Sequence, residues 1–274
     1  MRIVHKVFFT LLVFILITVS AASAADTVQP KSGILHTKDG IIISYDHYKE
    51  GSRPVIIVCP GFFNSKDNRW MRRSVEMLNS NYDVIIFDFR GHGKSTGKYT
   101  WSAKEYMDLD AVIDYAKSSG YKYIGILAFS LGAAVAVNEA AVRSDIDSMV
   151  LISCPSRFQS IDYCFWEPGM FSDLKDNMEC NWQGKGAKFS NIFMHKEDPI
   201  DSIRLIKNTP LLFLQGDNDW VIKARHAKKL YDAAISEKKL GIIKDGLHAE
   251  RLLQFHYDEV KDLVLDWFSK TIKS

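Results

Sequence analysis

Short apolar runs recur along the chain from residue 55 onward, separated by longer amphipathic stretches. Each run is nearly continuous rather than alternating, which is typical of strands that are covered on both faces of a parallel sheet. We predict strands of this kind at Val55–Cys59, Val84–Asp88, Tyr123–Ala128, Ser148–Ser153, Leu211–Gln215 and Lys239–Ile243. Ahead of them, Gly33–Thr37 and Ile41–His47 flank Lys38-Asp39-Gly40, where Asp-Gly supplies the turn of an antiparallel hairpin.

Helical periodicity fills most of the gaps between these runs. We predict helices at Arg69–Asn79, Ser102–Ser118, Leu131–Arg143, Ile222–Ile235 and Glu250–Thr271. The second begins with Ser102-Ala103-Lys104-Glu105, a capping-box pattern in which serine and glutamate satisfy each other's backbone amides. Alternating strands and helices indicate the α/β class, with a mostly parallel, doubly wound sheet behind the N-terminal antiparallel hairpin.

The alternation stops between about residues 155 and 208. Because an unstructured loop of that length is improbable inside a compact domain, we interpret this segment as an inserted lid that covers a site. The segment carries many aromatic residues: Phe158, Tyr163, Phe165, Trp166, Phe171, Trp182, Phe189 and Phe193. The sequence leaves open whether these aromatics form the core of the lid or line an apolar pocket.

The N-terminus has the three regions of a secretory signal peptide. Basic residues precede an apolar run of 13 residues, Val7–Val19, and small residues follow it. The run is shorter than the roughly 20 residues of a membrane span, so we expect cleavage after Ala24 or Ala25. The 26–274 domain would then be periplasmic or secreted and have no stable membrane span. An uncleaved N-terminal anchor is the alternative.

The composition is that of an ordinary globular domain, with 47% hydrophobic and 25% charged residues. Removal of Arg2 and Lys6 with the signal peptide leaves 33 basic and 33 acidic residues. This balance gives no electrostatic reason to expect binding to nucleic acid or to an anionic membrane.

Four cysteines are present, and the cysteines of an exported protein can form disulfides. Cys59 ends an apolar run, so we expect it to be a buried free thiol. Cys164 and Cys180 flank an irregular stretch and are the best candidates for a disulfide. A metal site is not expected, because there is no Cys-x-x-Cys pair and His195 is separated from every cysteine.

The segment Ala128-Phe129-Ser130-Leu131-Gly132 lies between a predicted strand and a predicted helix. A serine on such a sharp turn needs small residues two positions away on either side, because the strained elbow brings backbone segments close together. The turn would place the Ser130 hydroxyl near a helix N-terminus, whose dipole and free amides favour developing negative charge. The alternative interpretation of Ser130 is an ordinary helix N-cap.

A nucleophilic serine requires a histidine and a carboxylate later in the chain, each just after a strand. Asp217 and Asp219 follow the apolar run that ends at Gln215, and His248 follows the run that ends at Ile243. The order serine, acid, histidine is the one that accompanies this kind of elbow. One of the two aspartates would be the acid and the other would close the turn. For His248 the alternative is a surface-loop histidine.

The loop Cys59-Pro60-Gly61-Phe62-Phe63 follows the first parallel strand, where a second donor for an oxyanion is expected. The two candidate donors are the backbone amides of Phe62 and Leu131.

Together these motifs resemble the serine aminopeptidase/monoglyceride-lipase-like branch of the α/β-hydrolase superfamily. The segment Asp88-Phe89-Arg90-Gly91-His92-Gly93-Lys94-Ser95 is similar to the family's D-x-R-G-H-G-x-S loop, and the resemblance spans roughly residues 33–273. It implies an α/β-hydrolase fold, and the family spacing after Gly216 favours Asp219 as the acid. The sequence departs from the family at Ala128, where glycine is usual, and at Pro60, where histidine is frequent.

Other polar residues are assigned structural roles. We expect His92 to brace its own loop and Asp88 to cap or anchor it. His195, Asp198 and Asp201 near the end of the lid are interpreted as a solvated polar face.

The expected reaction is cleavage of an ester, thioester or amide through an acyl-enzyme on Ser130, with His248 as the base and Asp219 orienting it. No metal or organic cofactor is expected, and the partner is a small acyl substrate that is partly apolar. Two alternatives stay open: an acyltransferase with the same triad, and a binding protein that keeps the hydrolase fold without turnover. The fold does not identify the substrate.

Overall fold

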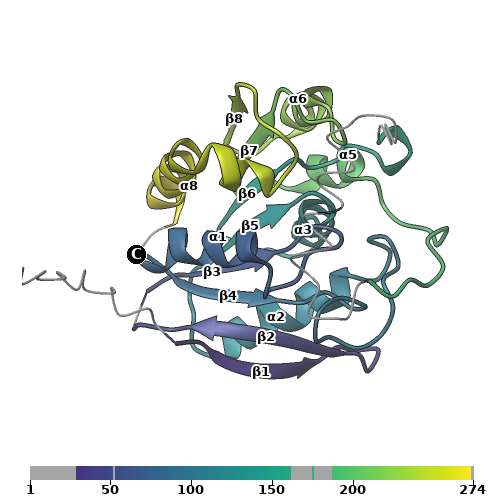
Figure 1. The fold of residues 1–274 in the computed structure, drawn as a ribbon, viewed down its shortest axis with the longest axis vertical. Coiled ribbons are helices and arrows are strands. Elements are labelled where there is room, and N and C mark those ends of the chain that lie inside the picture. Colours follow the sequence, from purple (N-terminus) through teal and green to yellow (C-terminus); the bar gives the residue numbers. More distant parts are fainter. Residues whose placement is uncertain (1–28, 52, 162–174, 176–186, 273–274) are drawn as a thin grey trace, which may run out of the picture.

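The computed structural model of the chain describes residues 29–51, 53–161, 175 and 187–272. Within these residues one sheet has the strand order β1-β2-β4-β3-β5-β6-β7-β8 (Figure 1). The strands are β1 (Lys31–His36), β2 (Ile42–Tyr48), β3 (Val55–Cys59), β4 (Asp83–Phe87), β5 (Ile124–Phe129), β6 (Ser148–Ile152), β7 (Leu211–Gly216) and β8 (Lys238–Ile243). β1 and β2 pair antiparallel, β2 runs antiparallel to β4, and the remaining pairs are parallel. The predicted sheet and its N-terminal hairpin are confirmed.

The parallel register brings the carboxyl ends of the central strands to one edge of the sheet. Cys59 at the end of β3 is opposite Ala128 of β5, and Phe129 is opposite Ile152 of β6. At the other side of β6, Gly216 at the end of β7 is opposite Ile243 of β8. The loops after β3, β5, β6, β7 and β8 therefore leave the sheet at the same edge, which is where ligands bind in open α/β sheets.

Helices cover both faces of the sheet (Figure 1). α1 (Arg69–Asn79), α7 (Arg251–Phe255) and α8 (Tyr257–Thr271) share an apolar cluster with one face. α2 (Tyr106–Ser118), α3 (Leu131–Ala140) and α6 (Ala224–Ala233) share a second cluster with the other face. Between β6 and β7 lie the turn Phe158–Ser160, the short helix α5 (Pro199–Ser202) and the turn Ile203–Leu205. Successive side chains of a strand point to opposite faces of the sheet, so each buried strand contributes residues to both clusters.

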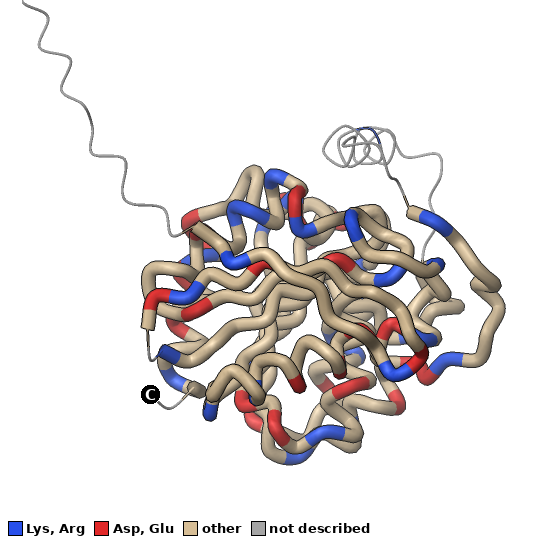
Figure 2. Tube along the Cα trace, turned by 90° about the horizontal axis from the view of Figure 1, so that it is seen from below, with Lys and Arg blue, Asp and Glu red and all other residues tan. Residues whose placement is uncertain are grey.

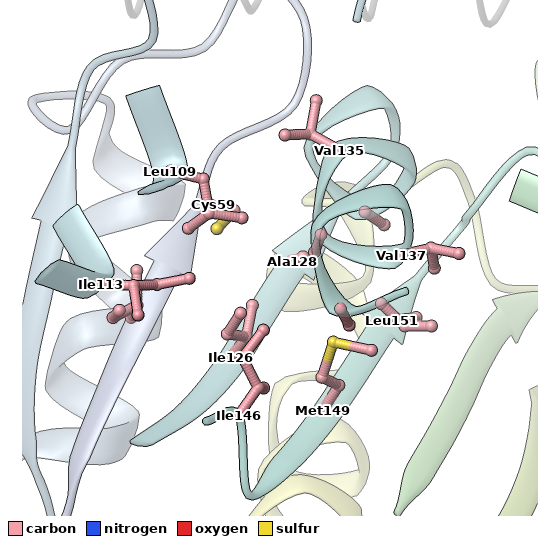
Figure 3. Packing of buried hydrophobic residues seen from close by; sticks show 14 of the residues in the cluster. Cys59, Leu109, Ile113, Ile126, Ala128, Val135, Val137, Ile146, Met149 and Leu151 are labelled. Atoms are coloured by element: carbon pink, nitrogen blue, oxygen red, sulfur yellow. The ribbon is translucent and has the colours of Figure 1, made fainter. Parts of the chain in front are cut away.

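Figure 3 shows how the second cluster is packed. Leu109 and Ile113 of α2 and Val135 and Val137 of α3 lie over the central strands. The strand residues beneath them, at most 1% exposed, are Cys59, Ile126, Ala128, Met149 and Leu151. Burial of each leucine, isoleucine, valine or methionine side chain contributes roughly 1.5–3 kcal/mol, so this face anchors the strands from which the loops depart.

The predicted start of α2 is wrong. The helix begins at Tyr106 rather than Ser102, and the predicted capping box does not form. Ser102 has a left-handed backbone with φ of 69°, and its hydroxyl is buried without a hydrogen-bond partner in the described part of the chain. The Glu105 carboxylate instead accepts the Thr100 amide at 2.7 Å and the Thr100 hydroxyl at 2.8 Å. The capping box requires the Glu105 carboxylate to accept the Ser102 amide, and here that carboxylate is bound to Thr100 instead.

The predicted C-terminal helix, Glu250–Thr271, is divided into α7 and α8 at His256, whose φ of −129° and ψ of 35° are not helical. Leu252 and Leu253 before the break and Val260 and Val264 after it lie in the same apolar cluster. A change of direction lets two short amphipathic segments turn their apolar faces toward that cluster.

Positive and negative residues are interspersed over the chain in Figure 2. Two of the buried basic side chains form ion pairs in the interior. Lys66 Nζ lies 2.9 Å from Asp46 Oδ2, and Arg90 Nη2 lies 2.7 Å from Asp108 Oδ1. None of the helices in the described ranges combines the length and the hydropathy of a membrane span.

Candidate active site

Ser130 stands at the turn between β5 and α3 with φ of 50° and ψ of −120°. A non-glycine residue with positive φ is strained, and such residues gather at functional sites. The Ser130 amide donates to the Ile152 carbonyl at 2.8 Å, which ties the turn to the neighbouring strand β6. A Cβ at Gly132 would lie 2.2 Å from the carbonyl oxygen of Pro60. Only glycine therefore fits there, as the elbow pattern predicts.

His248 follows β8 and faces this serine. Its Nε2 lies 3.0 Å from Ser130 Oγ, and its Nδ1 lies 2.8 Å from Asp219 Oδ2. The loop is shaped by Asp245 and Ala249, which have φ of 57° and 46°. The structure thus brings His248 into contact with Asp219, 29 positions away, and with Ser130, 118 positions away.

Asp219 is 1% exposed, whereas Asp217 is exposed. Its Oδ1 accepts the amides of Val221 at 2.9 Å and Ile222 at 2.8 Å, and its Oδ2 accepts Gln215 Nε2 at 2.9 Å. Burial by itself would raise the pKa of Asp219, but the adjacent His248 imidazole and hydrogen bonds from the Ile222 amide and the Ser153 hydroxyl hold that pKa below its usual range. The carboxylate is therefore ionised at neutral pH.

Two residues around this acid were not singled out from the sequence. Gln215 is fully buried at the end of β7. Ser153, also fully buried and with φ of 52°, follows β6; its hydroxyl is hydrogen-bonded to the Asp219 carboxylate and accepts the Ala249 amide at 3.0 Å. Each of these two residues is the polar residue that ends an apolar run, and this position is the one sequence signal that could have pointed to them.

The loop after β3 lies against the serine. A Cβ at Gly61 would be 3.2 Å from Ser130 Cβ, so the backbone leading to Phe62 passes close to Ser130. Leu131 is the first residue of α3, and the first amides of a helix lack intrahelical acceptors. The backbone amides of both candidate donors therefore belong to segments that adjoin Ser130.

His92 braces this loop. Its Nε2 lies 3.3 Å from the Phe63 nitrogen and its Nδ1 lies 3.2 Å from the Arg90 carbonyl. Burial lowers the pKa of His92 to about 4. The ring is therefore neutral, with Nδ1 donating to the carbonyl and Nε2 accepting the Phe63 amide. Asp88 anchors the same region by accepting the amides of Lys66 at 2.7 Å and Lys94 at 2.8 Å.

Comparisons with known proteins bear on the fold. A family described as alpha/beta hydrolase fold matches residues 54–172. Lysophosphatidylserine lipase ABHD12 of Xenopus tropicalis is 30% identical over 212 residues, which are 72% of this chain and 50% of that protein. Protein ABHD12B of Homo sapiens is 27% identical over 205 residues, covering 69% and 52%. The chain thus spans about half the length of these two relatives.

Solved structures match over a larger share. Esterase Pf2001 of Pyrococcus furiosus superposes with a TM-score of 0.73 at 25% identity, covering 90% of this chain and 92% of that one. Carboxylesterase CesB of Bacillus subtilis, at 15% identity and a TM-score of 0.66, shares the fold over 88% of this chain and 92% of its own. This chain belongs to the α/β-hydrolase superfamily. The fold predicted from the sequence is therefore confirmed, and esterases and a lipase are among the similar proteins.

An apolar cluster adjoins Ser130 in this α/β-hydrolase. Its buried members are Tyr99, Leu131, Ala134, Phe158, Ile161 and Ile222, and Phe62, Trp101 and Val221 pack against them. Two of these residues, Phe158 and Ile161, belong to the segment after β6. The cluster therefore supplies an apolar wall next to the serine.

The C-terminal part of the 155–208 segment contacts the same apolar cluster. The Tyr99 amide donates to the Lys188 carbonyl at 2.7 Å, and the Ser190 amide donates to the Tyr99 carbonyl at 2.9 Å. The ring of Phe189 lies 5.5 Å from that of Phe62 between centroids. The described ends of the 155–208 insertion thus lie against the loops that surround Ser130.

The remaining sequence candidates lie elsewhere. Asp198 and Asp201 pair with Arg157, and exposed His195 is 3.1 Å from Glu197, so these residues form a solvated polar face on the hydrolase. Cys59 is a buried free thiol as expected, and so is Cys154. The predicted Cys164–Cys180 disulfide lies outside the described residues.

Proposed function

We propose that this α/β-hydrolase cleaves a carboxylic ester, or a related thioester or amide, through an acyl-enzyme on Ser130. The observation that carries the proposal is the hydrogen-bonded chain from Ser130 Oγ through His248 to Asp219, at 3.0 and 2.8 Å. These distances lie within the range required of a nucleophile and its base. The ionised, multiply hydrogen-bonded Asp219 would fix the imidazole with its proton on Nδ1, which leaves Nε2 free to accept the serine proton.

The reaction would proceed in two acyl-transfer steps. Ser130 Oγ bonds to the carbonyl carbon while its proton passes to His248 Nε2, and the alcohol then leaves with that proton. Water attacks the acyl-enzyme in the same way and releases the acid and the free serine. The amides of Phe62 and Leu131 would donate to the oxyanion in both steps, and losing one such donor typically costs about 10² to 10³ in turnover.

The surroundings of Ser130 favour a substrate with an apolar acyl or alcohol group. Leu131, Tyr99 and Phe158 belong to the apolar cluster beside the serine, and burial of such a group supplies about 25 cal/mol per Å². The relatives support this class, because one is a lysophosphatidylserine lipase and a similar structure is an esterase.

A fluorophosphonate probe tests the proposal, because it reacts with an activated serine. We expect wild type to be labelled and Ser130→Ala and His248→Ala to lose labelling and ester hydrolysis. Ser118→Ala is the matched control, since that hydroxyl is exposed at the end of α2 and, among the described residues, donates locally to the Tyr115 carbonyl. A folded wild type that neither labels nor hydrolyses esters would instead support a binding role.

Two further features remain part of this proposal. Residues 1–25, which lie outside the described residues, would be a signal peptide that directs export, and residues 155–208 would form the lid. N-terminal sequencing of the exported protein would show a start at Ala25 or Asp26. A chain that retains the apolar run Val7–Val19 would indicate the anchor instead.

A further inference from the structure

Two loops must hold their positions relative to each other if the proposed reaction is to occur. The oxyanion loop, residues 60–64, carries the Phe62 amide, and the histidine loop, residues 244–250, carries His248. Both act on one carbonyl group in the same step, and a misplacement of about 1 Å can cost 10²-fold in rate. Neither loop is part of a strand or helix. Their relative position therefore depends on side-chain contacts.

One buried hydrogen bond joins the two loops directly. Asn64 Nδ2 donates to Glu250 Oε1 at 2.9 Å, across 186 positions of sequence. Asn64 is 2% exposed and Glu250 is 3% exposed. The Asn64 backbone amide also donates to the Gly61 carbonyl at 3.2 Å, closing the turn that carries Phe62. Glu250 comes two residues after His248. Asn64 therefore belongs to the loop that carries the Phe62 amide, and Glu250 belongs to the loop that carries His248.

Two other hydrogen bonds hold each loop to its own side of the sheet. In the oxyanion loop, Phe63 is held by His92 of the loop after β4. In the histidine loop, Ala249 is held by Ser153 at the end of β6. The contact between Asn64 and Glu250 differs because it crosses from one loop to the other.

The physical chemistry makes this contact strong and directional. A carboxylate that accepts an amide N–H in a buried site forms a charge-assisted hydrogen bond, about twice as strong as a neutral one. Asn64 Oδ1 is buried and has no hydrogen-bond partner in the described part of the chain. The orientation of the Asn64 side chain is therefore set from its Nδ2 end, by Glu250.

We infer that Asn64 and Glu250 form a positioning pair that fixes the Phe62 amide relative to His248. The inference rests on the proposed function, because it gives the pair a role in the proposed reaction. Neither side chain is assigned a proton transfer or a contact with substrate. Their effect on the reaction is exerted through the two backbones that they connect.

Isosteric substitutions test the pair without creating a cavity. Asn64→Asp sets two carboxylates against each other and removes the donor. Glu250→Gln keeps a carbonyl oxygen as acceptor. In Asn64→Asp/Glu250→Gln the hydrogen bond can form again with donor and acceptor exchanged. The control pair is Asn79 and Glu50, an exposed Asn–Glu contact at 3.4 Å, changed in the same way.

The readouts are kcat and KM for a p-nitrophenyl ester, the rate of fluorophosphonate labelling and the Tm. We expect Asn64→Asp to lower kcat and the labelling rate about 10- to 100-fold with KM changed less than about threefold. Glu250→Gln should keep kcat within about fivefold of wild type, and the double variant should recover to near that value. The Asn79 and Glu50 variants should keep wild-type kcat.

Three results would overturn the inference: a folded Asn64→Asp variant with wild-type kcat, a double variant as slow as Asn64→Asp, or a change confined to Tm. If Asn64→Asp does not fold, Glu250→Ala removes the acceptor from the other side and must show the same loss of kcat. Absence of labelling in wild type would instead overturn the proposed function. Wild-type labelling that Ser130→Ala abolishes, together with an unimpaired Asn64→Asp, would overturn this inference alone.

Discussion

The buried amide of Gln215 donates from Nε2 both to Oδ2 of Asp219, at 2.9 Å, and to the Ile222 carbonyl, at 2.7 Å. One side chain thus fixes the carboxylate and the backbone beyond it. Asp217, two residues earlier, is exposed. This arrangement separates two aspartates that look alike in the sequence and makes Asp219 the proposed acid.

Asp219→Asn should lower kcat about 10⁴-fold while the protein stays folded, because an amide cannot stabilise the imidazolium and favours the wrong tautomer of His248. Asp217→Asn is the matched control and should keep kcat within about threefold. Ester hydrolysis and the Tm of both variants check this. Comparable losses in the two variants would contradict the assignment of the acid.

Ser153→Ala should lower kcat about 10- to 100-fold with little change in KM. The Ser153 hydroxyl holds both the Asp219 carboxylate and the Ala249 amide beside His248, and a hydrogen bond to a charged group contributes roughly 1.5–3 kcal/mol. Ser148→Ala at the opposite end of β6 is the control, since its hydroxyl contacts only Thr271 among the described partners. Steady-state kinetics of both variants distinguish a positioning role from a general effect on the strand.

Gly132→Ala should destabilise the protein by about 3 kcal/mol and slow fluorophosphonate labelling. The new Cβ would lie 2.2 Å from the Pro60 oxygen and 2.8 Å from the Cys59 oxygen, so the loop that carries Phe62 must shift. Gly51→Ala is the control, because no described atom beyond its chain neighbours lies within 4 Å of its Cβ position. Urea unfolding measures the difference, and equal stability of the two variants would show that the elbow is not tightly packed.

His92 should make the protein less stable in mild acid. Its folded pKa of about 4 is below the unfolded value of 6.5, so as the pH falls below 6.5 the unfolded chain takes up a proton that the folded chain does not. The free energy of unfolding should therefore fall by about 2 kcal/mol between pH 7 and pH 5 through this residue.

The variant for this measurement is His92→Gln, which has no titrating group and keeps a carbonyl that can accept the Phe63 amide. Urea unfolding at the two pH values should show a smaller pH dependence than in wild type, by about 2 kcal/mol. Identical pH dependence in the two proteins would mean that His92 takes up a proton in the folded protein as readily as in the unfolded chain.

Local pattern was enough for much of the fold and the candidate site. The apolar runs predicted β3 with its observed ends and the other strands to within one residue at most ends. Because parallel strands end at one edge, the loops that carry Ser130, Asp219 and His248 were expected to meet. The predicted start of α2 was wrong because the Glu105 carboxylate is hydrogen-bonded to Thr100, a contact that hydrophobic periodicity does not predict.

The order of strands and helices along the chain, the elbow at Ser130 and the loops that approach it follow from the amino-acid sequence alone. Periodicity and turn chemistry act over a few residues, so these features can be read locally. The burial of Asp219 and the contact between Asn64 and Glu250, 186 positions apart, are set by the packing of the folded chain. Such contacts depend on which side chains share a desolvated space after the sheet has formed. Burial then makes a hydrogen-bond partner necessary, and no local pattern specifies which residue supplies it.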